Sequence, residues 1–171
     1  MPELCRTSVE EYREMEKLPV CLVADNVRSR HNVGAFFRTA DAFRIHSIYL
    51  CGISPLPPDT DIHKTALGAE KAVQWQHFPS TMKAIDYLLE EGWTIVALEQ
   101  THNSVELDSF HPAPDEKIAL IAGNEVEGVS EEVLRRCHYM VEIPQQGTKH
   151  SLNVSVSAGI ALYTLFLRQK G

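Results

Sequence analysis

Five short segments of the chain are almost continuously apolar and rich in aliphatic and β-branched residues. Segments of this length and composition are typical of strands that are covered on both faces, as in a parallel sheet. The predicted strands are residues 20–24, 47–51, 94–98, 118–122 and 139–143.

Helix-like segments alternate with these strands, a pattern that predicts an α/β fold with a mostly parallel sheet flanked by helices. Ser8 and Glu11 form the pattern of a capping box at the start of the first helix. Ser80 and Ser130 stand at N-cap positions, and Gly92 stands where a glycine often ends a helix. The predicted helices are residues 8–17, 32–43, 80–91, 130–136 and 152–167, and the predicted loops include 53–59 and 101–116. A short helical segment at 1–19 thus precedes a single domain at 20–171.

The composition is that of a globular protein with one core, because the chain has 171 residues, of which 44% are hydrophobic. The N-terminus has no apolar segment typical of a signal peptide, and the most apolar stretch, 151–167, is interrupted by polar residues and glycine. We therefore expect a cytoplasmic protein that contacts no membrane. The four cysteines are far apart and form no Cys-x-x-Cys pair, so we expect reduced thiols and no metal site.

The net charge of −7 argues against extended binding to a nucleic-acid duplex, which depends on many phosphate contacts. Basic residues are nevertheless concentrated locally. Residues 27–40 contain three arginines and no acid, and no acid follows Glu142. Such a distribution permits a compact site for an anionic group.

The first candidate segment, residues 25–41, runs from the end of the first predicted strand into a helix, where open α/β sheets place ligands. Asn32 is positioned to cap that helix, Gly34 allows close backbone approach, and Arg38 lies within two turns of Asn32. Free N–H groups at a helix start, flanked by arginines, suit a phosphate group. The alternative is an amphipathic helix whose arginines are solvated.

The second candidate segment, residues 121–130, is a glycine-bracketed turn between a strand and a helix. Gly123 and Gly128 permit backbone conformations that other residues avoid, and a side chain at Gly123 would project into space needed for a ligand. The pattern fits either a backbone-lined pocket or a tight turn. It is not the Gly-x-Gly-x-x-Gly fingerprint of dinucleotide-binding sheets, which the chain lacks.

The third candidate segment, residues 143–156, joins the last predicted strand to the last helix through a polar loop that contains glycine and no acid. Ser151 or Asn153 could simply cap the helix. The concentration of polar residues beside a strand end favours a site for a polar ligand.

In order and spacing, the three segments resemble the three motifs of the SpoU/TrmH family of SPOUT RNA methyltransferases. The shared patterns are Asn-x-x-x-x-x-Arg, Gly-x-Glu-x-x-Gly and Ile-Pro-x-x-Gly-x-x-x-Ser-Leu-Asn, and the resemblance covers residues 20–167. It implies the SPOUT fold with a deep C-terminal trefoil knot, and a SpoU methyltransferase domain at 20–171. It also implies a homodimer whose active sites are built from both subunits.

The resemblance further implies S-adenosylmethionine as the cofactor and transfer of its methyl group to a ribose 2′-hydroxyl of RNA. The residues implied to bind the cofactor, mainly through backbone groups, are Leu98, Gly123, Ile143 and Leu152, with Ser151 adjacent. The candidate RNA-binding residues are Arg28, Arg30, Arg38 and Lys149.

Arg38 matches the arginine of the family's first motif. Arginine loses its proton only near pH 13, so a neutral arginine at pH 7 costs roughly 8 kcal/mol. We therefore expect Arg38 to bind phosphate and to stabilise a developing alkoxide, in preference to acting as a base. Asn32, Glu125, Ser151 and Asn153 are expected to orient the ribose, the guanidinium and the surroundings of the cofactor.

Two other functions are compatible with a chain of this kind. A non-catalytic RNA-binding or ribosome-assembly protein could use the same scaffold, although Arg38 and Asn153 are both present. A nucleotide-binding enzyme on an unknotted sheet would need a glycine fingerprint or a P-loop, and neither occurs. For the substrate, a small acidic dimer suits a loop of a structured RNA, and we expect tRNA in preference to rRNA.

Overall fold

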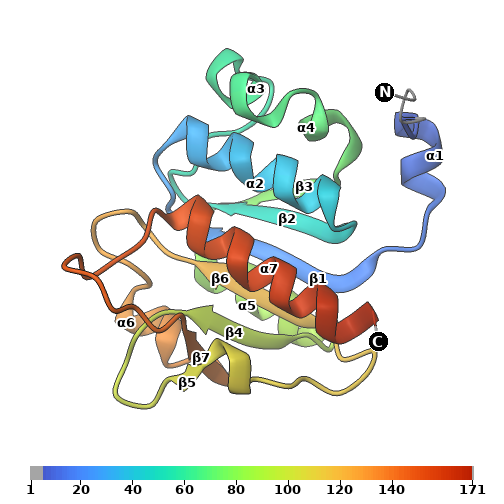
Figure 1. The fold of residues 1–171 in the computed structure, drawn as a ribbon. Helices are drawn as coiled ribbons and strands as arrows, with labels where there is room; N and C mark the ends of the chain where they lie inside the picture. The colour runs from blue at the N-terminus through green and yellow to red at the C-terminus, as the bar shows by residue number, and fades with distance from the viewer. Residues whose placement is uncertain (1–5, 171) are drawn as a thin grey trace.

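A parallel sheet of seven strands forms the centre of residues 6–170, which are the residues that the computed structural model describes (Figure 1). Cys5 and the N-terminal residues on which the absence of a signal peptide was predicted lie outside the described residues. The strand order is β3-β2-β1-β6-β4-β7-β5, and each neighbouring pair is parallel. The strands are β1 Leu18–Asp25, β2 Ile45–Cys51, β3 Trp75–Phe78, β4 Thr94–Leu98, β5 Val105–Glu106, β6 Ile118–Ala122 and β7 Tyr139–Glu142.

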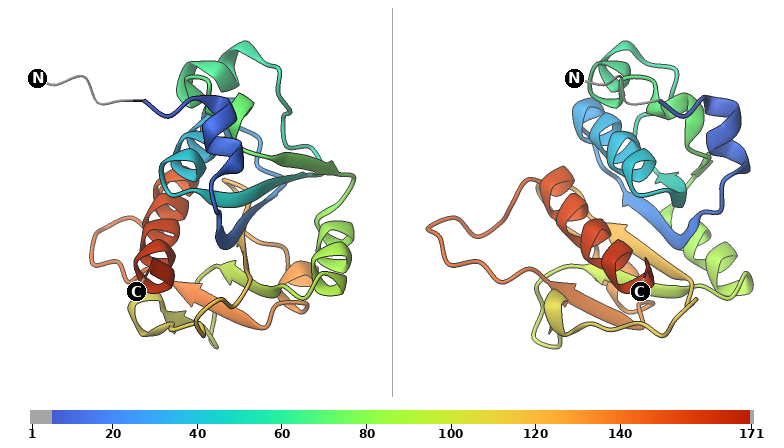
Figure 2. Two further views of the ribbon diagram at one scale, coloured as in Figure 1. Left: turned by 90° about the vertical axis from the view of Figure 1, so that its right-hand side faces the viewer. Right: turned by 45° about the vertical axis from the view of Figure 1, so that its right-hand side comes forward.

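Helices cover both faces of the sheet, so the central strands are buried on both sides. Leu22 belongs to the core beneath α2 and α7, whereas its neighbour Val23 belongs to the core beneath α5. Figure 2 shows α7 and α5 on opposite sides of the sheet. The helices are α1 Val9–Glu14, α2 Arg30–Ala42, α3 Thr60–Ala66, α4 Ala69–Ala72, α5 Thr81–Glu90, α6 Glu131–Leu134 and α7 Val154–Lys170, with a 3₁₀ turn, η1, at Leu107–Ser109.

The five predicted strands are confirmed, with boundaries that differ by at most two residues. β3, β5, α3 and α4 were not predicted, and the predicted loop at 101–116 contains β5 and η1. β3 and β5 lie at the two edges of the sheet, where one side of the strand faces solvent. Gln76 and His77 of β3 are exposed, so this strand lacks the continuous apolar pattern of the central ones.

The helix termini agree with the predicted caps except at α2. Ser8 and Glu11 form the expected capping box, and Gly92 follows α5 with φ +82°. α2 begins at Arg30 and is capped by Ser29, whose hydroxyl accepts a hydrogen bond from the Asn32 N–H at 3.2 Å. The prediction that Asn32 caps this helix is therefore wrong, because the Asn32 side chain is engaged elsewhere.

The order of strands in the sheet departs from chain order after β4. β6 lies between β1 and β4, and β7 lies between β4 and β5. After β5, the chain crosses β4 to form β6 on its other side and then returns to form β7. α7 follows and packs against α2 and β1. The predicted α/β class with a mostly parallel sheet is confirmed, while the trefoil knot stays a prediction.

The described cysteines, Cys21, Cys51 and Cys137, are free. Burial raises the pKa of the Cys51 and Cys137 thiols to about 12, so both are protonated and unreactive at neutral pH. No helix within residues 6–170 is long and apolar enough to cross a bilayer. The same residues contain no group of three or more histidine, cysteine, aspartate or glutamate side chains placed to hold a metal ion.

Candidate active site

A cavity of about 690 Å³ opens at the carboxyl ends of β4, β6 and β7. Its walls come from the segment after β4, the turn 123–129 after β6, and the segment 141–154 that leads from β7 to α7. Figure 1 shows the loop between β7 and α7 projecting beyond the sheet. Because the strands are parallel, their carboxyl ends meet at one edge, and this edge is the usual ligand position of such folds.

The five residues predicted to hold the cofactor all line this cavity. Leu98, Gly123 and Ile143 lie at the ends of three strands, and Ser151 and Leu152 lie just before α7. The side chains of Leu98, Ile143 and Leu152 are apolar, and Ser151 adds a hydroxyl. The structure thus brings together Leu98, Gly123, Ile143, Ser151 and Leu152.

Gly123 is required for a reason other than the one expected. A Cβ atom at Gly123 would lie 2.4 Å from the carbonyl carbon of Gly128 and 2.4 Å from the nitrogen of Val129. It would therefore collide with the backbone on the far side of the turn and would not project into open ligand space. The glycine allows the turn to close on itself, and the closed turn forms one wall of the cavity.

Gly34 likewise serves helix packing. A Cβ atom at Gly34 would lie 1.9 Å from the Thr65 hydroxyl and 2.3 Å from the Ile62 carbonyl oxygen, both on α3. The close backbone approach predicted at Gly34 is thus an approach of α2 to α3.

Glu125 joins the second candidate segment to the first. Its carboxylate accepts hydrogen bonds from the Arg28 N–H at 3.0 Å, the Ser29 N–H at 2.9 Å and the Asn32 amide at 3.1 Å. Partial burial raises the pKa of this carboxyl, but the three donated hydrogen bonds outweigh it and leave the pKa below the ordinary value. The charged carboxylate also lies next to the start of α2, where a negative charge is favourable.

Asn32 extends this connection to the third segment. Its side-chain oxygen accepts a hydrogen bond from the Asn153 amide at 3.3 Å. The Asn153 oxygen in turn accepts from the N–H groups of Ser155 and Val156, at 2.9 and 3.3 Å, and so caps α7. Asn153 therefore caps α7, which was the alternative considered from the sequence. It also contacts Asn32, another of the residues expected to orient the ribose, the guanidinium and the surroundings of the cofactor.

The predicted basic residues do not gather in the cavity. Arg28, Arg38 and Lys149 are exposed, and their side chains form no hydrogen bond or ion pair with the rest of residues 6–170. Arg30 is paired with Asp59 at 2.8 Å, an acid that also caps α3. Of the three arginines in the acid-free stretch 27–40, Arg30 is thus neutralised by an acid from a distant segment.

Two acidic residues at this end of the sheet were not singled out from the sequence. Glu99 lines the cavity, and its carboxylate accepts from the N–H groups of Val129 and Gln100 at 3.0 and 3.1 Å. Asp25 is 3% exposed and accepts a hydrogen bond of 2.5 Å from the Thr81 hydroxyl. Each follows or ends a predicted strand, which is the signal that could have identified them.

The comparisons with known proteins agree with this geometry. The model of the SpoU rRNA Methylase family matches residues 19–163. The 23S rRNA (guanosine-2′-O-)-methyltransferase RlmB of Neisseria meningitidis is 33% identical over 144 residues, which cover 84% of this chain and 56% of that protein. The chain therefore spans little more than half the length of this curated relative.

Two solved structures have similar folds and sequences. The A. aeolicus TrmH/SpoU tRNA modifying enzyme superposes with a TM-score of 0.83 and 27% identity, covering 95% of this chain and 81% of that one. The AdoMet-bound rRNA methyltransferase from Sinorhizobium meliloti superposes with a TM-score of 0.81 and 26% identity, covering 90% of this chain and 59% of that one. With the family model matched across all three candidate segments, the chain belongs to the SpoU rRNA methylase family.

Proposed function

We propose that this chain is an S-adenosylmethionine-dependent RNA methyltransferase that methylates a ribose 2′-hydroxyl. The observation that supports this most directly is that the second and third candidate segments line one cavity, while the hydrogen bonds of Asn32 with Glu125 and Asn153 attach the first segment to both of them. The family membership, the 2′-O-methyltransferase relative and the AdoMet-bound neighbour support the same reaction.

The residues that line the cavity suit S-adenosylmethionine. A nucleoside requires apolar surface for its base and a few polar groups for its edges, and small-molecule cavities have volumes of roughly 300–1,000 Å³. The cavity of about 690 Å³ supplies Leu98, Ile143 and Leu152 as apolar surface and the strand-end backbone as polar surface. When bound, the cofactor supplies an electrophilic methyl group on a sulfonium centre.

The protein must then hold the ribose and stabilise the charge that develops on its oxygen. We assign this role to Arg38, whose planar guanidinium can bind a phosphate group and stabilise an alkoxide. Asn32, Glu125 and Asn153 fix the starts of α2 and α7 beside the cavity, and Ser151 is free to contact ligand. Arg28 and Lys149 are available for neighbouring phosphates.

Arg38 does not line the cavity of its own chain, and this supports a homodimer in which it serves the partner's cavity. An apolar stripe on α7 is a suitable interface. Its side chains repeat at helical spacing and are 50, 39, 48 and 53% exposed at Val156, Ile160, Tyr163 and Leu167. α7 packs against α2, which carries Arg38.

Light scattering tests the dimer. The wild-type protein should have twice the mass of its 19.2 kDa chain, and Ile160→Glu should yield a folded monomer without methyltransferase activity. Leu67→Glu, which makes the same change at a 62% exposed position outside the stripe, should remain dimeric. An active wild-type monomer would contradict the shared site.

The reaction is tested with purified protein, a labelled methyl donor, and either deproteinised tRNA or rRNA. Nucleoside mass spectrometry should find the added methyl group on a ribose. We expect tRNA to be the substrate, because loops of a structured RNA present unpaired nucleotides and a tRNA modifying enzyme is among the solved structures of similar fold. Label on rRNA alone would reject the tRNA assignment, and label on a base would reject the ribose assignment.

A further inference from the structure

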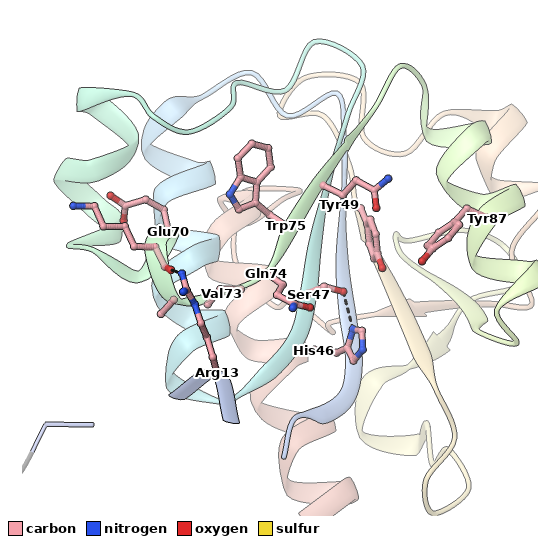
Figure 3. A pocket seen from close by; sticks show the side chains of 12 residues that line it. Arg13, His46, Ser47, Tyr49, Glu70, Val73, Gln74, Trp75 and Tyr87 are labelled. Carbon is pink, nitrogen blue, oxygen red and sulfur yellow. Dashed lines mark hydrogen bonds between the residues drawn. The ribbon is translucent and has the colours of Figure 1, made fainter. Parts of the chain in front are cut away.

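A second cavity, of about 780 Å³, lies at the opposite end of the sheet, around the amino ends of β2 and β3. We call it the β3 cavity, and its lining comes from α1, α4, α5, β2 and β3 with the segment before it. Figure 3 shows Arg13 and Glu70 on one side, Tyr49 and Tyr87 on the other, and Trp75 between them. The three candidate segments contribute no residue to this cavity.

Aromatic and amide groups dominate the middle of the β3 cavity. Trp75 is half-buried on the edge strand, and its ring has no aromatic neighbour within residues 6–170, whereas Tyr49 and Tyr87 pair with each other at 6.1 Å. Gln74 and Gln76 flank Trp75, are exposed, and have side chains without a hydrogen-bond partner among the described residues. Successive residues of a strand point to opposite faces, so the indole of Trp75 and the amide of Gln76 lie on different sides of β3, and it is the unpaired indole that is suited to stacking with a planar ring such as a nucleobase.

Cations border the same cavity. Arg13 and Lys71 form no ion pair with an acid within the described part of the chain, and the Arg13 guanidinium donates to the Lys71 carbonyl oxygen at 2.8 Å. A phosphate attached to the base would meet this charge.

Glu70 supplies an acceptor that lacks a donor. Its side chain is only 8% exposed; Oε1 contacts His63 Nδ1 at 2.5 Å, while Oε2 is buried without a hydrogen-bond partner. A buried acceptor of this kind is costly unless a ligand donates to it. The exocyclic amino group of cytosine is a suitable donor for a carboxylate, whereas uracil presents its N–H between two carbonyl oxygens.

We propose that the β3 cavity binds one unpaired, amino-bearing nucleotide of the RNA substrate. Its base stacks on Trp75 and donates to Glu70, and its phosphate contacts Arg13 and Lys71. The inference rests on the proposed RNA substrate. The two cavities lie at opposite ends of the sheet and on different strands, with β1 between β2 and β6, so an RNA that occupies both must extend across the sheet.

Tryptophan fluorescence tests the binding without any methyl transfer. Stacking of a base should quench Trp75, while Trp93, which is 5% exposed, should respond little. Short oligo(C) should quench the wild-type protein and bind roughly fivefold more tightly than oligo(U), and Trp75→Phe should show no quenching. Glu70→Gln should remove the preference for cytosine. Equal affinity for both oligonucleotides, or quenching that persists in Trp75→Phe, would overturn the assignment of these residues.

Steady-state methylation provides the second test. Replacing both cations, Arg13→Gln with Lys71→Gln, should raise the KM for RNA about fivefold and reduce the salt slope of binding by about 1.4. The kcat and the affinity for S-adenosylhomocysteine should not change, because the β3 cavity is remote from the candidate active site. Lys83→Gln, a matched change on α5 outside the cavity, should leave the KM unaltered.

The two tests separate this inference from the proposed function. If RNA is methylated but neither quenching nor a KM change occurs, the β3 cavity is not an RNA site and the function stands. If oligo(C) quenches Trp75 as expected but no RNA is methylated, the β3 cavity stands as an RNA site and the proposed reaction is wrong.

Discussion

Glu125 offers the sharpest test of how the candidate site is held together. Glu125→Gln removes the charge of a carboxylate that accepts three hydrogen bonds, from Arg28, Ser29 and Asn32. Hydrogen bonds to charged groups contribute about 1.5–3 kcal/mol each when buried. Because Glu125 is exposed, water screens these contacts, and we expect a total loss of about 1–2 kcal/mol in the free energy of unfolding.

Urea unfolding at neutral pH measures this loss. With a slope of roughly 2 kcal/mol per molar urea, the midpoint should fall by about 0.5–1 M. Glu127→Gln makes the same charge change two residues away, where the side chain has no hydrogen bond among the described residues, and it controls for the net charge of −7. The midpoint of this control should stay near that of the wild type.

The pH dependence provides an independent check on the same residue. The folded-state pKa of Glu125 lies below its ordinary value of 4.5, so its stabilisation is present above the ordinary value and is lost as pH falls through the folded-state pKa. The stability difference between wild type and Glu125→Gln should therefore shrink in acid. A difference that is constant with pH, or a Glu125→Gln midpoint equal to that of Glu127→Gln, would refute this account of the carboxylate.

Two further substitutions follow from the geometry of the site. Gly123→Ala places a Cβ atom 2.4 Å from the backbone across the turn, so it should lower the free energy of unfolding by about 1–3 kcal/mol. Calorimetry should also show weaker binding of S-adenosylhomocysteine. Gly147→Ala, which has open space around the new Cβ atom, should change neither quantity. Arg38→Lys should bind S-adenosylhomocysteine normally and fail to methylate RNA, because a point charge does not replace a planar fork. Near-normal turnover of Arg38→Lys would show that its assigned role is wrong.

The central strands could be predicted because burial on both faces leaves a continuous apolar pattern, as in β6, where Ile118–Ala122 is entirely buried. The edge strands could not be predicted by the same rule. β3 exposes Gln76 and His77, and it is recognisable as a strand only through its pairing with β2. Residues 60–72 form two short helices whose stability depends on packing against α2 and not on a strong local pattern.

Within the candidate site, the sequence could identify the segments but not the contacts between them. Ser29 and Asn32 are both good N-cap residues, and the choice between them depends on Glu125, which lies 93 residues beyond Asn32. The collision that makes Gly123 necessary involves Gly128 and Val129 and depends on the closure of the turn. Such facts belong to tertiary structure, so no local pattern contains them.

The hydrogen bonds divide the predicted catalytic residues into two groups with different roles. Glu125, Asn32 and Asn153 satisfy one another and the starts of α2 and α7, so their polar groups are already occupied by the protein. Arg38 and Ser151 have exposed side chains without a partner among residues 6–170, which leaves them available to a ligand. Arg38 lies on α2, and Glu125 holds the first turn of that helix. In the proposed dimer, the position of Arg38 relative to the partner's cavity therefore depends on the hydrogen bonds of Glu125. We therefore expect substitutions in the first group to change stability and activity together, and substitutions in the second to change activity alone.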